Sequence, residues 1–149
     1  IYFTGGSDSN LNRLREAVSI SAYSFEVTQK APMLTARAAH GAMYHCMYLY
    51  VIGGNAFKKC ERLSVRENRW ETLQPLPKTV YNVSVVVLEG THCLYAFGGS
   101  YNQSPLDIIQ RLRLGSLEWD VMPIRLPRAA YNIACFRSDD YQVKLVLGG

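Results

Sequence analysis

Histidine, cysteine and tyrosine side chains could equip this chain for metal binding or nucleophilic catalysis. Its three histidines are His40, His45 and His92. His40 and His45 lie in a stretch that we expect to be strand, at an odd spacing, so their side chains point to opposite faces. The sequence holds no G-x-S-x-G elbow for a nucleophilic serine. We therefore expect no catalytic residue, no metal site and no cofactor.

The four cysteines do not follow a metal-binding or redox pattern. Their positions, Cys46, Cys60, Cys93 and Cys135, fit neither zinc-ligand nor C-x-x-C spacing. Cys46, Cys93 and Cys135 lie in apolar stretches, where a free cysteine behaves as a small hydrophobic residue. We expect buried, reduced thiols and hence a cytoplasmic compartment.

Composition and charge exclude several classes of protein. The chain is 48% hydrophobic and 19% charged, which is typical of a globular domain. Its formal net charge is only +4, and its basic residues are scattered, with Lys58 and Lys59 the longest run. We therefore expect no nucleic-acid partner. No stretch has the roughly 20 apolar residues of a membrane-spanning helix, so we expect no membrane partner.

A repeated phrase organises the chain. IYFTGG, LYVIGG, LYAFGG and KLVLGG each place strand-favouring residues before two glycines, and the second glycines, Gly6, Gly54, Gly99 and Gly149, recur every 45 to 50 residues. A nearly fixed period of this length indicates a repeat architecture. Helix signals are almost absent apart from LNRLREA at 11–17, which has the propensity of a helical turn.

Further landmarks recur in phase with the glycines. Trp70 and Trp119 each stand seven residues after a leucine, and the same offset from Tyr23 leads to Lys30. A basic residue follows each of these positions at Arg37, Lys78 and Arg128, and an aromatic ring comes three residues later at His40, Tyr81 and Tyr131.

This order of landmarks resembles the kelch repeat along the whole chain. The resemblance implies an all-β, kelch-type β-propeller, here a partial one of about three blades of four antiparallel strands, from a propeller of six or seven blades. The chain then forms one propeller fragment over 1–149, with blade boundaries near 38, 79 and 129. It begins and ends in mid-blade, so we expect the remaining blades in the same full-length polypeptide.

The resemblance also implies structural roles. The glycine pairs bend the chain and leave room for a neighbouring segment, the tryptophans fill the gaps between blades, and the basic residue reaches polar backbone groups. The residues expected in these roles are Gly5, Gly6, Gly53, Gly54, Gly98, Gly99, Gly148, Gly149, Trp70, Trp119, Arg37, Arg128 and His40.

The function that the resemblance implies is a non-catalytic platform for protein partners, acting as an adaptor or scaffold. Ubiquitin-ligase substrate recruitment and cytoskeletal association are the two expected settings. The alternative is a kelch-type propeller enzyme such as a metal-dependent oxidase.

In adaptor-type propellers, partners contact the residue after the glycine pair and the residue two past the conserved arginine. Adding loop residues of the types found at interfaces, the expected contacts are Ser7, Asn55, Ser100, Ala39, Val80, Ala130, Tyr101, Asn102 and Arg13.

Overall fold

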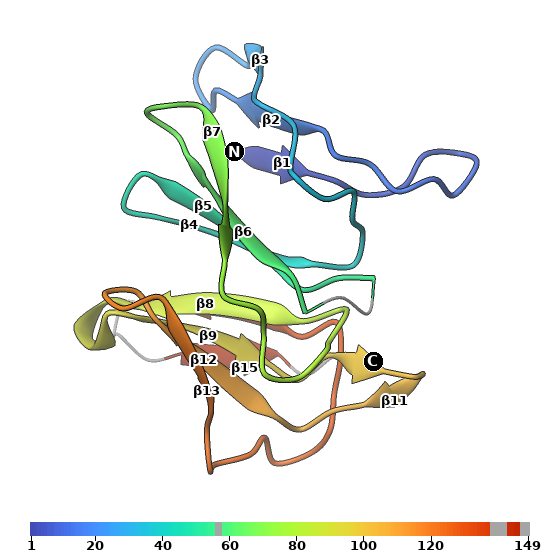
Figure 1. The fold of residues 1–149 in the computed structure, drawn as a ribbon, viewed down its shortest axis with the longest axis vertical. Helices are drawn as coiled ribbons and strands as arrows, with labels where there is room; N and C mark the ends of the chain where they lie inside the picture. Colours follow the sequence, from blue (N-terminus) through green and yellow to red (C-terminus); the bar gives the residue numbers. More distant parts are fainter. Residues whose placement is uncertain (56–57, 138–142, 147–149) are drawn as a thin grey trace.

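Antiparallel sheets make up almost all of the regular structure (Figure 1). The structure is a computed structural model that describes residues 1–55, 58–137 and 143–146. The first sheet contains β1 (Tyr2–Thr4), β2 (Ala17–Ile20) and β3 (Val27–Gln29). The second contains β4 (Gly41–His45), β5 (Tyr48–Ile52), β6 (Cys60–Ser64) and β7 (Arg69–Leu73).

The third sheet repeats the second. It contains β8 (Ser84–Leu88), β9 (Cys93–Phe97), β12 (Ile109–Arg113) and β13 (Glu118–Val121), and β14 (Ala134–Arg137) pairs with β15 (Val143–Val146) in a fourth. A small hairpin, β10 (Ser100–Tyr101) and β11 (Ser104–Pro105), lies between β9 and β12, and η1 (Glu89–Thr91) is a single 3₁₀ turn. The expected all-β class with four-stranded antiparallel blades is confirmed.

Successive sheets pack face to face, and the second, third and fourth sheets radiate from their first strands. Strand β8 contacts both β4 and β14, while β7 and β13 lie at the opposite edges of their sheets (Figure 1). A separate cluster of buried apolar side chains fills each gap between neighbouring sheets. The expected blade boundaries near 38, 79 and 129 fall in the connections before β4, β8 and β14.

The strand register corrects the expected alignment of the first blade. Leu63 pairs with Trp70, and Leu112 pairs with Trp119. The three sheets can be aligned on the strand that comes directly before each glycine pair. In this alignment the corresponding residues of the first sheet are Ile20 and Val27, which pair with each other. Tyr23 instead lies in the β2–β3 turn with 97% of its surface exposed. Val27, and not Lys30, therefore takes the tryptophan position, because β2 ends at Ile20 and Tyr23 lies beyond it.

The position of the conserved arginine also shifts. The amides of Gly6, Gly54 and Gly99 donate to the carbonyl oxygens of Arg37, Val80 and Ala130, respectively. These three residues are therefore equivalent, and the expectation that Arg128 fills the arginine position is wrong: it stands two residues earlier, exposed in the connection before β14. By the same alignment the equivalents of His40 are Val83 and Ile133, rather than the expected tyrosines. Counting from the misplaced Lys30 caused both errors.

The glycine pairs have the expected close neighbours at most positions. A Cβ atom on Gly5, Gly53 or Gly98 would lie 2.3 to 2.7 Å from a carbonyl oxygen of the following connection. Gly54 and Gly99 are also crowded, whereas a Cβ on Gly6 would meet no atom within 4 Å. Gly148 and Gly149 lie outside the described residues.

The segment 11–17 is not helical. The Asp8 carboxylate accepts hydrogen bonds from the backbone amides of Asn10 and Asn12, at 2.9 and 2.8 Å, and from the Asn12 side chain. Leu11 adopts a φ of 64° within this turn. The aspartate therefore stabilises an irregular turn at 8–12 in place of a helical one, as expected of a side chain that competes with helical hydrogen bonds.

Candidate functional site

One end of the sheets gathers the polar, exposed positions of the repeat. The glycine pairs, the residues that follow them and the connections between sheets all meet there, because each glycine pair bonds to the connection that leads into the next sheet. We call this end the mouth. The connections 5–16, 30–40, 74–83 and 122–133 contribute to it, together with Asn55 and Ser100, which follow the other two glycine pairs.

A hollow of about 310 Å³ at the mouth brings together residues that are distant in the sequence. Arg13, Ala39, Asn55 and Tyr81 line this mouth hollow. The first three were expected as contact residues, and the structure places them around one concave surface. Arg13 and Ala39 are exposed, and Asn55 is half-buried.

Hydrogen bonds hold the walls of the mouth hollow in place. The Asn55 side-chain oxygen accepts from the Ala38 amide at 3.2 Å, which fixes the loop after the glycine pair against the preceding connection. The Tyr81 hydroxyl accepts from the Gln103 amide at 2.9 Å and keeps its own proton for another acceptor. Hydrogen bonds therefore hold Asn55 and Tyr81 in place around the hollow, which Arg13 also lines.

A ladder of backbone hydrogen bonds crosses the mouth from sheet to sheet. Ala39, Asn82 and Asn132 occupy equivalent positions and share a left-handed conformation, with φ values of 55°, 53° and 51°. The Asn82 amide donates to the Ala39 carbonyl at 2.7 Å, and the Asn132 amide donates to the Asn82 carbonyl at 3.1 Å. Asn82 and Asn132, not Val80 and Ala130, are thus the residues two past the arginine position.

Two of the expected contact residues belong to the core instead. Val80 is 0% exposed and Ala130 is 5% exposed, and each packs in a cluster between sheets. The asparagines were missed, although the string Leu-Pro-x-x-x-Tyr-Asn recurs at 76–82 and 126–132 and marks the correct register.

The remaining expected contacts differ in accessibility. Ser100 is 3% exposed and pairs with Tyr81 through its backbone, so its side chain offers little surface. Ser7 is exposed beside Arg13, with which it forms an isolated bridge. Tyr101 and Asn102 are exposed on the β10–β11 hairpin, and neither lines the mouth hollow.

A buried ion pair supports the mouth from below. Arg37 donates from Nη1 to the carbonyl oxygens of Gly53 and Lys59, at 2.7 and 2.8 Å, and from Nη2 to the Glu61 carboxylate at 2.5 Å. Glu61 also accepts from the Leu34 amide at 2.7 Å. Because both charged groups are almost fully buried, the pair ties the glycine turn to the connection before it.

His40 lies beside this pair in a poorly solvated position. Its Nε2 atom is 2.9 Å from the Thr4 hydroxyl. Burial, reinforced by the nearby Arg37 charge, lowers the pKa of His40 to about 4. His40 is therefore neutral at physiological pH.

The thiols do not all follow the expectation. All four cysteines are free, but Cys46 is exposed in the β4–β5 turn, where His45 Nε2 lies 3.1 Å from its sulfur. Burial raises the pKa of Cys60 to about 12, so this thiol is inert. In the part of the chain that the structure describes, no three His, Cys, Asp or Glu residues are placed to hold a metal ion.

Within residues 1–55, 58–137 and 143–146, no helix has the length and hydropathy to cross a membrane.

Comparison with known proteins supports the repeat assignment. No family model matches the chain. The chain is 31% identical over 103 residues to Kelch-like protein 40 of Mus musculus, and 30% identical over 113 residues to Kelch-like protein 25 of Xenopus tropicalis. These matches cover 66% and 67% of this chain but only 16% and 19% of the relatives, so the chain spans less than a fifth of their length.

Proposed function

Since this chain belongs to the kelch-repeat family, we propose that it is a non-catalytic module that binds protein partners and acts as an adaptor or scaffold. The observation that carries this proposal is the mouth hollow, in which Arg13, Asn55 and Tyr81 converge from three separate connections. Mixed polar and aromatic groups on a rigid concave surface suit recognition of a protein segment.

The connections at the mouth are held in place before a partner binds. The ladder through Ala39, Asn82 and Asn132 joins three sheets through their backbones. A partner that contacts two connections at once then loses little free energy in ordering them, because they are already held.

Two settings extend the proposal: recruitment of substrates to a ubiquitin ligase, and association with the cytoskeleton. We place the protein in the cytoplasm, because its four cysteines are free and one of them, Cys46, is exposed. Free, exposed thiols persist in reducing compartments.

Affinity capture with a matched pair of variants tests the proposal. Arg13→Glu reverses a charge at the mouth hollow, and Arg66→Glu makes the same change in the β6–β7 turn at the opposite end of the sheet. We expect the wild-type chain and Arg66→Glu to capture one protein at a stoichiometric level, insensitive to chelators, and Arg13→Glu to lose it at least tenfold.

Equal capture by both variants would exclude the mouth hollow as the contact surface. Co-sedimentation of the captured complex with filaments separates the cytoskeletal setting from the ligase setting. Elemental analysis of the purified chain tests the alternative of a metal-dependent oxidase, which requires stoichiometric metal.

A further inference from the structure

The turn between β12 and β13 carries a serine that follows two arginines. Ser116 comes three positions after Arg113 and five after Arg111, and an apolar residue, Leu117, follows it. No other serine or threonine in the sequence has arginine at both of these distances. Protein kinases select substrates partly by the charges near the hydroxyl group, and carboxylates on the kinase bind such guanidinium groups. The sequence around Ser116 is therefore of the type that an arginine-selecting kinase accepts.

Ser116 is accessible in the folded chain. It is exposed in the turn 114–117, and a Cβ atom on the neighbouring Gly115 would meet no atom within 4 Å. This turn lies at the end of the third sheet opposite the mouth, because Arg113 at the end of β12 pairs with Cys93 at the start of β9. An enzyme can therefore approach the hydroxyl group without contacting the mouth.

Positive charge is in excess beside this turn. Arg111 and Arg113 are two positions apart in β12, so their side chains lie on the same face of the sheet. Both donate from Nη2 to the same carboxylate oxygen, Oδ2 of Asp120, at 2.6 and 3.0 Å. The Arg113 side chain is 46% exposed, and an ion pair this exposed contributes little free energy. Arg113 can therefore leave Asp120 for a carboxylate of a kinase, while Arg111 keeps that carboxylate neutralised.

The second sheet shows that the same turn accommodates an anion. Asn68 and Leu117 hold equivalent positions in the two turns and have similar φ values, 51° and 59°. Glu67 occupies the place of Ser116, and its carboxylate pairs with Arg69 at 3.1 Å. A negatively charged group at this position is therefore compatible with the fold, and phosphorylation of Ser116 would supply one.

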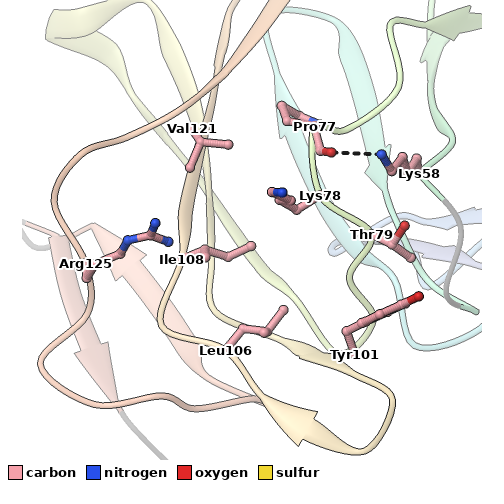
Figure 2. A pocket seen from close by; sticks show the side chains of 9 residues that line it. All are labelled: Lys58, Pro77, Lys78, Thr79, Tyr101, Leu106, Ile108, Val121 and Arg125. Atoms are coloured by element: carbon pink, nitrogen blue, oxygen red, sulfur yellow. Dashed lines mark hydrogen bonds between the residues drawn. The ribbon is translucent and has the colours of Figure 1, made fainter.

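Strand β13 can open at this turn without loss of the blade. It is an edge strand with β12 as its neighbour, and local opening at such an edge requires less free energy than global unfolding. Its far end is packed, since Val121 and Ile108 line a hollow between the second and third sheets (Figure 2). Leu112, 0% exposed, holds β12 in the core. The turn can therefore enter the cleft of a kinase while the rest of the sheet stays in place.

We propose that Ser116 is a phosphorylation site for a protein kinase that selects arginine three and five positions before the modified residue. The Ser116 hydroxyl oxygen attacks the γ-phosphorus of ATP, the bond from that phosphorus to the β–γ bridging oxygen breaks, and ADP leaves. The hydroxyl proton passes to the catalytic aspartate of the kinase. This inference does not depend on the proposed function, because the site lies away from the mouth.

Phosphorylation of the full, folded chain in vitro tests the proposal. The chain is incubated with ATP and a purified kinase of this arginine selectivity, and mass spectrometry of the intact and digested chain gives the number and position of the phosphates. We expect a single phosphate, on Ser116, and none after Ser116→Ala. Arg113→Ala should slow the reaction by about tenfold or more, because it removes a charge-assisted contact with the kinase.

Thr72 provides a matched control within the same chain. It is exposed in β7 and follows Arg69 by three positions, but the residue five positions before it is the acidic Glu67. Thr72→Ala and Arg69→Ala should therefore leave the rate and amount of phosphorylation unchanged. Thermal unfolding of each variant shows whether its fold is intact.

Three outcomes would overturn the inference: no phosphate on the folded chain, a phosphate that persists in Ser116→Ala, or equal rates for Arg113→Ala and Arg69→Ala. A synthetic peptide of residues 109–121 forms a separate arm. Phosphorylation of the peptide but not of the folded chain would also overturn it, since the turn would then be closed to the kinase. Partner capture through the mouth hollow is measured separately, so failure of either proposal leaves the other standing.

Discussion

At the scale of single residues, the Arg37–Glu61 pair is the main buried electrostatic contact among the described residues, with side chains 0% and 2% exposed. The equivalent positions in the next repeat hold Val80 and Gln110, so the chain itself contains a version without charge. Arg37→Val should cost about 3 to 5 kcal/mol, because it leaves the Glu61 carboxylate buried without its partner.

A double-mutant cycle by chemical denaturation measures this coupling. Arg37→Val/Glu61→Gln reproduces the pair found in the next repeat and should recover about 1 to 3 kcal/mol relative to the sum of the single variants. Purely additive costs would show that the ion pair does not stabilise the mouth.

His40 should make stability depend on pH. Because its folded-state pKa is about 4, below the usual value near 6.5, the unfolded chain binds more protons between these values. The contribution of neutral His40 to the free energy of unfolding is therefore complete above pH 6.5 and is lost as the pH falls toward 4. At pH 5 the loss should be about 2 kcal/mol.

The matched variant is His40→Val, which copies the equivalent residue Val83. Denaturant unfolding at pH 7.5 and pH 5 should show a loss for the wild-type chain that exceeds the loss for this variant by about that amount. Equal losses would mean that His40 is solvated in the folded protein.

At the scale of elements, the two tryptophan strands seal their blades differently. Trp70 of β7 donates from its indole nitrogen to the Ala31 carbonyl at 2.6 Å, whereas the buried indole nitrogen of Trp119 in β13 has no partner among the described residues. Trp70→Phe should therefore lower the free energy of unfolding by about 1 kcal/mol more than Trp119→Phe does. The second substitution removes only a donor that is already unsatisfied. Melting temperatures of the two variants test this order, and the reverse order would contradict it.

At the scale of the whole molecule, the glycine pairs set the distance between neighbouring blades. Gly54 and Gly6 both have positive φ values, 86° and 103°. A Cβ on Gly54 would lie 2.5 Å from the Ala38 carbonyl oxygen, whereas one on Gly6 would meet nothing within 4 Å. Gly6→Ala should lower the free energy of unfolding by about 1 to 2 kcal/mol, because alanine is strained at a positive φ. Gly54→Ala should lower it by about 1 to 3 kcal/mol more, because its Cβ atom also has no room.

Denaturant unfolding of these two alanine variants provides the comparison. Equal losses would show that the blades can separate without cost at this turn, and that the close approach at Gly54 does not hold them together.

Much of the architecture followed from local patterns. The recurring strand-Gly-Gly phrase and the two tryptophans carried the resemblance to the kelch repeat, and that resemblance implied all-β, four-stranded blades; these landmarks could be read from the sequence because they are properties of short segments. The same reasoning failed where spacing alone had to set the register, as when Lys30 was aligned with the tryptophans instead of Val27.

The sequence by itself determined the kind of repeat and three of the four residues around the mouth hollow: Arg13, Ala39 and Asn55. Only the tertiary structure decided that Val80 and Ala130 are core and that Asn82 and Asn132 replace them at the surface. Hydrogen bonds between distant segments choose which residue of a connection faces outward, and a shift of one or two residues leaves the local pattern almost unchanged.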